Sequence, residues 1–129
     1  LLYGALGVAG ADTPCTHGPA VAGLGRVAEV GVNNTGTSCA RLEDGAVWCW
    51  GTNESGQLGR GGGSDPDGHP TPMVVLGLER GVRQLSMGTR HVCVLRDDAS
   101  IWCWGYNGNG EAGTPIVAYT SSARPVRWP

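Results

Sequence analysis

A gapless internal repeat constrains this chain more than any other feature of its sequence. Residues 39–59, CARLEDGAVWCWGTNESGQLG, align with residues 93–113, CVLRDDASIWCWGYNGNGEAG, at a shift of 54 residues. Nine of the 21 aligned positions are identical, and the opening YGALG resembles the end of a further copy. A fixed period of this length is typical of solenoids, propellers and other repeat arrays. We therefore expect two full copies and pieces of others at both ends.

Each copy predicts an antiparallel hairpin. The segments TSCARL and AVWCW are short and β-rich, and Glu-Asp-Gly between them suits a three-residue loop with Gly45 in the left-handed region. This register places Cys39 opposite Cys49. The second copy uses Asp-Asp-Ala and places Cys93 opposite Cys103. Because no segment of ten residues has a helical period, the chain is expected to be all-β.

The two faces of the hairpin explain where the tryptophans lie. Alternation along a strand sends Trp48 and Trp50 to one face and Cys49 to the other. Trp102 and Trp104 repeat this arrangement in the second copy. Both faces are apolar, so the hairpin should be covered on both sides. We expect the four tryptophans to belong to the core rather than to a ligand platform.

Composition argues against several classes of function. The chain has nine basic residues, all arginine, against eleven acidic ones, and they form no cluster. A nucleic-acid partner or an anionic membrane surface is therefore not expected. No stretch approaches the roughly 20 apolar residues of a membrane span. No nucleophile with its base, phosphate-binding loop or carboxylate pair is recognisable, so we predict neither an enzyme nor a cofactor.

Two groups of residues are candidates for a metal site. The cysteines with nearby His91 lack the Cys-x2-Cys spacing typical of zinc sites. In RGGGSDPDGH at 60–69, Asp65 and Asp67 are weak calcium candidates, without the further ligands of a calcium loop. We predict no metal, and we interpret this segment as a polar turn between strands. Its candidate recognition residues are Arg60, Asp65, Asp67 and His69.

The frame Trp-Gly-x-Asn-x-x-Gly-x-x-Gly, with the preceding Asp-Gly and following Pro-Val, resembles repeats of the regulator of chromosome condensation family. The resemblance implies a seven-bladed β-propeller of four-stranded antiparallel blades. About two and a half repeats of a longer ring are present, with the rest of the propeller missing from this chain. It also gives His91 a structural place inside a blade, hydrogen-bonded to backbone. The core positions are Trp48, Trp50, Gly51, Asn53, His91, Trp102, Trp104, Gly105 and Asn107.

The period divides one propeller domain into a partial repeat at 1–29, a full repeat at 30–83, and a second at 84–129 that is incomplete at its end. Copies joined head to tail would duplicate about twenty residues at each junction. For that reason we expect an excerpt of a longer polypeptide rather than a self-assembling ring. The oligomeric state itself does not follow from the sequence.

The cysteines point to a subtype. Family variants with this Cys-x9-Cys pair resemble bacterial, exported ones, which implies the disulfides Cys39–Cys49 and Cys93–Cys103. Directly opposed residues on antiparallel strands lie within reach of a disulfide. Disulfides favour an oxidising, extracytoplasmic location: secreted, periplasmic or on the cell surface. Cys15 is left over, and its partner is not identified by the sequence.

These observations favour a non-enzymatic, exported propeller scaffold that recognises another protein through its inter-strand loops. One alternative is a structural subunit or rigid module of a bacterial surface or particle assembly. Another is guanine-nucleotide exchange on a small GTPase, as in the nuclear member of the family. The cysteine pairs and the lack of a basic surface count against that second alternative.

Overall fold

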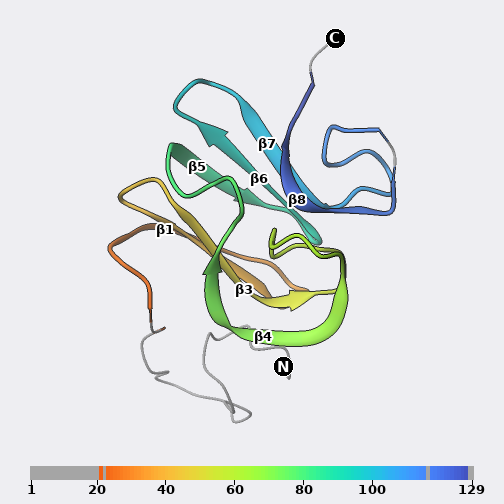
Figure 1. Ribbon diagram of the computed structural model, residues 1–129, viewed down its shortest axis with the longest axis horizontal. Coiled ribbons are helices and arrows are strands. Elements are labelled where there is room, and N and C mark those ends of the chain that lie inside the picture. The colour runs from red at the N-terminus through yellow and green to blue at the C-terminus, as the bar shows by residue number, and fades with distance from the viewer. Residues whose placement is uncertain (1–20, 22, 116, 128–129) are drawn as a thin grey trace.

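The computed structural model describes residues 21, 23–115 and 117–127, and these form two four-stranded antiparallel sheets (Figure 1). The first sheet contains β1 (Val27–Val32), β2 (Thr37–Leu42), β3 (Val47–Asn53) and β4 (Asp65–Val74). The second contains β5 (Val82–Met87), β6 (His91–Arg96), β7 (Ile101–Tyr106) and β8 (Tyr119–Pro125). The described part of the chain contains no helix, and hence none that could cross a membrane. The all-β prediction is confirmed.

Strand order follows chain order in each sheet, as in a propeller blade. The blades span 27–74 and 82–125, so the sequence-based boundary between 83 and 84 falls within β5. A sequence period fixes the length of a repeat but not the point at which the fold begins it. Cys15 and most of the segment 1–29 lie outside the described residues.

The central hairpins have the predicted register. Cys39 pairs with Cys49 in the first blade, and Cys93 pairs with Cys103 in the second. The tight loop of the first blade ends on Gly45 at φ 86°. In the second blade, Ala99 takes the equivalent left-handed conformation at φ 68°, which is strained for a residue with a side chain. Turn chemistry therefore sets the register in both copies.

The segment 60–69 departs from the prediction that it is a turn. Strand β4 begins at Asp65 and runs for ten residues, so the loop itself is confined to 60–64. β4 is the edge strand of its sheet, and its pairing with β3 shifts register on both sides of Gly51. Prolines are tolerated on an edge because one side of the strand needs no hydrogen-bond partner. The prolines of DPDGHPTP therefore do not prevent a strand here.

The core lies where the two blades meet. The face of the first blade that carries Cys39 packs against the face of the second that carries Trp104. Gly31 lies on this contact, and a Cβ there would come within 2.7 Å of Met87 Sδ. The shared buried cluster contains Cys39, Val47, Cys49, Leu58, Val75, Leu78, Val82, Leu85, Val92, Val94, Trp104 and Ala123.

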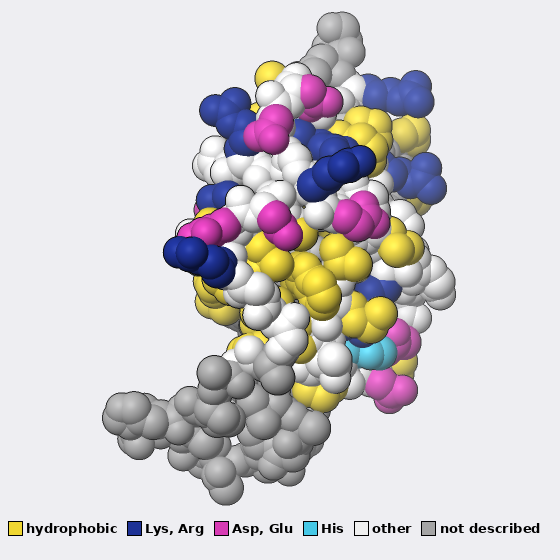
Figure 2. Space-filling model, turned by 60° about the vertical axis from the view of Figure 1, so that its left-hand side comes forward, with side chains coloured by type: hydrophobic (Ala, Val, Ile, Leu, Met, Phe, Trp, Pro, Cys, Tyr) yellow, Lys and Arg dark blue, Asp and Glu magenta, His cyan; other side chains and the backbone are white. Residues whose placement is uncertain are grey.

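The opposite face of the first blade is uncovered at β1. Val30 and Val32 are 62% and 68% exposed. Their counterparts in the second blade, Leu85 and Met87, lie against the first blade, and Leu85 is only 6% exposed. Hydrophobic side chains also gather on one side of the molecule with charged residues around them, as Figure 2 shows. One blade face thus remains without the covering that its equivalent has.

Candidate recognition site

A buried asparagine closes the turn after the third strand of each blade. Asn53 Oδ1 accepts a hydrogen bond from the Leu58 amide at 3.1 Å. Asn107 Oδ1 accepts one from the Ala112 amide at 2.9 Å. Both asparagines are buried, so the bonds are shielded from competition with water. This explains the asparagine of the repeated frame physically, since it holds the chain where the third strand ends.

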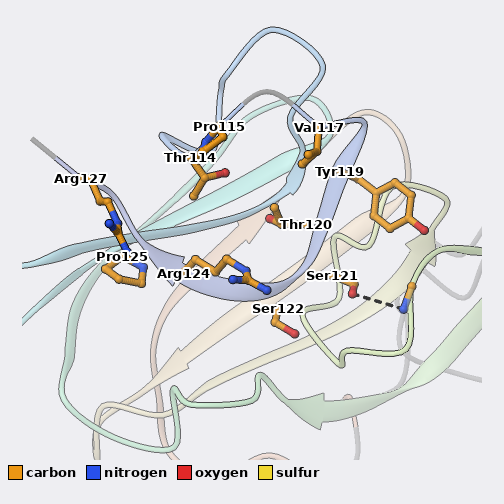
Figure 3. Close-up of a pocket in the computed structure, with 11 residues that line it drawn as sticks. Thr114, Pro115, Val117, Tyr119, Thr120, Ser121, Ser122, Arg124, Pro125 and Arg127 are labelled. Atoms are coloured by element: carbon orange, nitrogen blue, oxygen red, sulfur yellow. Dashed lines mark hydrogen bonds between the residues drawn. The ribbon is translucent and has the colours of Figure 1, made fainter.

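The other end of each asparagine holds an outer loop, and here the blades differ. Asn53 Nδ2 donates to Asp65 Oδ2 at 3.0 Å. Asn107 Nδ2 donates instead to Thr114 Oγ1 at 3.1 Å and to the Pro115 carbonyl at 3.0 Å. Thr114 and Pro115 line a cleft beside β8 (Figure 3). A constant residue therefore anchors loops of different sequence.

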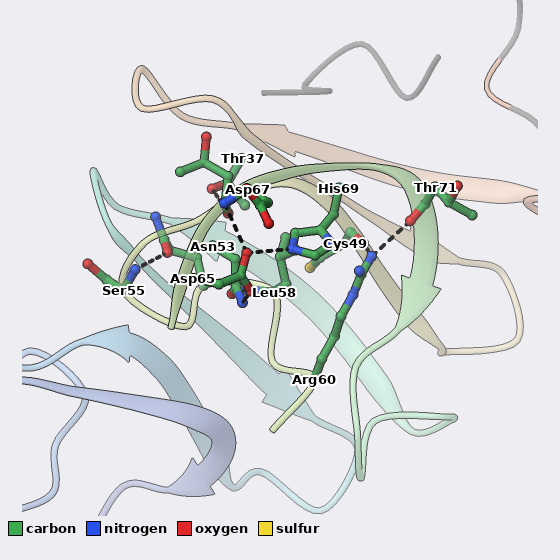
Figure 4. A network of polar contacts seen from close by, with 12 residues as sticks. Thr37, Cys49, Asn53, Ser55, Leu58, Arg60, Asp65, Asp67, His69 and Thr71 are labelled. Carbon is green, nitrogen blue, oxygen red and sulfur yellow. Dashed lines mark hydrogen bonds and ion pairs between the residues drawn. The ribbon is translucent and has the colours of Figure 1, made fainter. Parts of the chain in front are cut away.

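Three of the four predicted recognition residues meet in a polar network around Asp65 (Figure 4). Asp65 Oδ1 accepts from His69 Nε2 at 2.8 Å and from the Asp67 amide at 3.1 Å. Arg60 makes different hydrogen bonds: one of its terminal nitrogens donates to the carbonyls of Cys49, at 3.2 Å, and Thr71, at 2.8 Å. The structure thus brings Asp65, Asp67 and His69 together and gives Arg60 a separate role in bracing β4.

Exposure separates these four residues. Asp67 is exposed, and the others are half-buried. Burial acts to raise the pKa of Asp65, but hydrogen bonds from Asn53 and His69 and the Asp67 amide together hold it below its ordinary value. Burial lowers the pKa of Arg60, with the charge of Asp65 acting in the opposite direction. Asp65 therefore stays ionised as an internal acceptor.

The weak calcium candidates do not converge as ligands. Asp67 contacts Asp65 through its backbone amide, while both oxygens of the Asp65 carboxylate accept hydrogen bonds from protein groups. Within the described residues, no cluster of three or more His, Cys, Asp or Glu side chains could hold a metal ion. The geometry of this segment favours a structural network over a metal centre.

The four strand cysteines form two disulfides, Cys39–Cys49 and Cys93–Cys103, with Cα atoms 4.1 Å and 4.2 Å apart. Their surroundings differ. Cys39 and Cys49 are fully buried against the second blade, whereas Cys93 is half-buried. Each disulfide joins the two central strands of one blade, so both stiffen the framework below the loops.

The tryptophans and His91 divide between core and periphery. Trp50 and Trp104 are buried, whereas Trp48 and Trp102 are half-buried. Trp104 Nε1 donates to the Gln57 carbonyl of the other blade at 2.7 Å. The half-buried His91 ring packs against Gly88, and no side-chain hydrogen bond from it to the described residues is found. The backbone bond that the family resemblance implied for this ring is therefore replaced by packing.

Sequence reasoning missed the cleft beside β8. It has a volume of about 750 Å³, and Thr120, Arg124 and Arg127 are among its lining residues. At Pro125 and Val126 the sequence pattern indicated only the Pro-Val step that follows the repeated frame. The arginines on either side of Pro-Val lie outside the repeated frame, and that departure is the signal that could have revealed them.

Two family models, both described as the regulator of chromosome condensation (RCC1) repeat, match the chain. One matches residues 44–95, and the other matches 30–57 and 82–111. Together they cover residues 30–111 without a gap.

Curated proteins are similar to part of this chain. The mitochondrial RCC1 domain-containing protein RUG3 of Arabidopsis thaliana is 38% identical over 77 residues, which cover 58% of this chain and 16% of that protein. The human E3 ubiquitin-protein ligase HERC2 is 35% identical over 75 residues, covering 57% of this chain and 2% of that protein. This chain therefore spans only a small part of the relatives that it matches.

Solved structures agree in fold. Human WBSCR16 superposes with a TM-score of 0.60 at 23% identity, over 77% of this chain and 24% of that chain. The structure of Kap60 bound to yeast RCC1 (Prp20) gives a TM-score of 0.59 at 25% identity, over 72% of this chain and 21% of that chain. The structural comparison and the family models therefore both point to proteins with RCC1 repeats.

Proposed function

The chain belongs to the RCC1 repeat family, and from this membership we propose that it is a non-enzymatic propeller scaffold that recognises another protein through its inter-strand loops. The observation that carries the proposal is the paired use of Asn53 and Asn107. Each fixes the same turn, yet one holds Asp65 and the other holds Thr114. A rigid framework with variable loops is the usual basis of recognition by β-scaffolds.

The relatives support protein recognition at a coarse level. One solved neighbour is a complex of yeast RCC1 with another protein, Kap60. HERC2 is named as a ligase, but this chain covers 2% of it, so that activity is not transferred here.

We further propose an oxidising, extracytoplasmic location for the protein. Two disulfides within hairpins support it, because such bonds persist in secreted and periplasmic proteins and are rare in the cytosol. The repeat units 30–83 and 84–129 are proposed to belong to a larger ring, and the exposed β1 face supports this. A face whose equivalent is buried in the neighbouring blade is suited to a further blade.

Affinity capture with charge-reversal variants tests the proposed function. Asp67→Arg reverses an exposed charge in the candidate site. Asp97→Arg makes the same change in the hairpin loop between β6 and β7, at the opposite end of the strands from the loop that precedes β4. We expect the oxidised wild-type chain and the Asp97→Arg variant to retain a partner protein. The Asp67→Arg variant should not retain it.

Two results would count against this function. Equal retention by both variants would remove the candidate site from recognition. Recovery of the chain only in large particles, with no stoichiometric partner of different sequence, would favour the structural-subunit alternative. Reducing the disulfides before capture gives a further control, because loss of the framework should abolish binding by every variant.

A further inference from the structure

The cleft beside β8 lies at the junction of the two blades. One wall is the loop at 61–63, whose Gly61 amide donates to the Ser121 carbonyl at 2.8 Å and whose Gly63 amide donates to Ser121 Oγ at 3.2 Å. The opposite wall is the loop at 114–115, held by Asn107. Figure 3 shows Thr120 and Arg124 between these walls. The cleft is therefore fixed by hydrogen bonds on both sides, and its volume of about 750 Å³ suits a ligand.

All the charged residues that line this cleft are basic. Arg124 and Arg127 line the cleft, and no Asp or Glu does. Both arginines are exposed, and neither forms an ion pair or hydrogen bond with a residue that the structure describes. By contrast, Arg26 and Arg41 pair with Glu43 and Glu29. The cleft thus presents two uncompensated guanidinium groups, which favour an anionic ligand.

An unsatisfied hydroxyl lies in the same cleft. Thr120 is 9% exposed, and its Oγ1 is buried without a hydrogen-bond partner. A buried polar atom without a partner is costly, so it is uncommon in folded proteins unless a ligand or water completes it. A carboxylate in the cleft is the kind of group that could accept a hydrogen bond from this hydroxyl.

The first blade carries different chemistry at the same positions. Strand pairing makes Met73 the counterpart of Arg124, and His69 the counterpart of Thr120. The outer strand β4 contains Asp65 and Asp67 and no arginine. The basic cleft is therefore a property of one blade and not of the repeated frame.

Apolar groups lie beside the arginines. Val117 is 49% exposed and Tyr119 is 37% exposed, and both line the cleft. A small anion would use the arginines alone, whereas a peptide with acidic and apolar side chains would use both kinds of surface. β8 is also the edge strand of its sheet, a position at which proteins commonly bind extended peptides.

We propose that this cleft binds an extended acidic segment of a partner protein, with Arg124 and Arg127 contacting its carboxylates and Thr120 donating a hydrogen bond to it. This proposal rests on the proposed function in protein recognition and assigns it a second site, separate from the network at Asp65. Charge complementarity identifies the occupant, since the cleft has two free cations, the unpaired hydroxyl group of Thr120 and no acidic residue.

Fluorescence anisotropy on the oxidised 129-residue chain tests the proposal. The probe is a labelled seven-residue peptide, matching the length of β8, with Glu at alternate positions separated by Val and Thr. We expect binding that is lost when Gln replaces Glu. Arg124→Glu and Arg127→Glu should each weaken binding about tenfold or more, the effect of losing one charge-assisted hydrogen bond. Arg83→Glu, on the opposite edge strand β5, is the matched control and should keep the wild-type affinity.

Thr120→Val separates binding from folding. Because Thr120 Oγ1 has no partner in the protein, Val should leave the melting temperature unchanged or raise it. The same substitution should lower the affinity for the peptide severalfold. A variant that loses stability and binding together would indicate a structural role for Thr120 and overturn its assignment.

Other outcomes distinguish the source of the anion. Inorganic phosphate that competes as well as the peptide would indicate a small-anion site, and tighter binding of a single-stranded oligonucleotide would indicate nucleic acid; either would overturn the proposal. If the peptide fails to bind while affinity capture still depends on Asp67, this inference fails and the proposed function stands. If affinity capture also retains no partner, the proposed function fails with it.

Discussion

At the residue scale, Trp104 shows how one side chain joins two blades. Its indole is fully buried and donates to the Gln57 carbonyl of the first blade. Trp102, two residues earlier, is half-buried, bonds to Ser100 of its own blade and lies beneath the Arg96 guanidinium. The same residue type therefore holds the blades together at one position and covers a surface at the other.

Trp104→Ala should lower the free energy of unfolding by about 3–5 kcal/mol, because it opens a large cavity between the blades and leaves a carbonyl unpaired. Trp102→Ala is the matched control and should cost clearly less. Chemical denaturation followed by circular dichroism measures both. Equal midpoints for Trp104→Ala and the wild type would show that the residue is not part of the core.

Asp65 makes the stability of the protein depend on pH. Its hydrogen bonds lower its pKa in the folded protein below the unfolded value of about 3.9, despite the opposing effect of burial. The contribution of ionised Asp65 to the free energy of unfolding is therefore complete above the unfolded pKa, and it is lost as pH falls through the folded pKa. Asp65→Asn should remove this part of the pH dependence, as measured by denaturation midpoints between neutral pH and acid. Asp67→Asn should keep the wild-type dependence, and a parallel change in both variants would contradict the prediction.

At the scale of elements, the two hairpins have equal cross-links in unequal surroundings. Closing an eleven-residue loop is worth about 2.7 kcal/mol on the chain-entropy estimate. Cys93 is half-buried, whereas Cys39 and Cys49 are shielded by the second blade. We expect limiting dithiothreitol to reduce Cys93–Cys103 first, as followed by alkylation and peptide mapping. Simultaneous reduction of both bonds would show that local exposure does not control their reactivity.

These elements also show how far the sequence could be interpreted. The register of the inner hairpins was predictable, because the turn ending at Gly45 leaves only one alignment of its strands. The outer strand β4 was not, because its prolines and Gly68 suit a turn and an edge strand equally. The cleft was hidden for another reason. Arg124 becomes part of a site only through a loop of the other blade, more than fifty residues away in the chain.

At the scale of the whole molecule, the exposed β1 face and its buried counterpart form a natural comparison. Val30→Lys and Val32→Lys place charge on an exposed apolar surface and should reduce self-association without loss of stability. Leu85→Lys changes the equivalent of Val30 within the core and should unfold the protein. Light scattering coupled to size-exclusion chromatography measures association. A monodisperse trimer of the unmodified chain would favour ring formation by self-assembly.

The placement of the cross-links bears on how reliably the protein can be made. The four cysteines on the strands allow three complete pairings among themselves, and the observed one joins residues ten apart in both blades. A wrong bond between Cys49 and Cys93 would have to close a loop about four times longer, at an entropic cost greater by about 1 kcal/mol. Each hairpin can therefore oxidise correctly as soon as it forms, without waiting for distant parts of the chain. Further blades of this kind would multiply the possible pairings, yet in each new hairpin the local bond would still close the shortest loop.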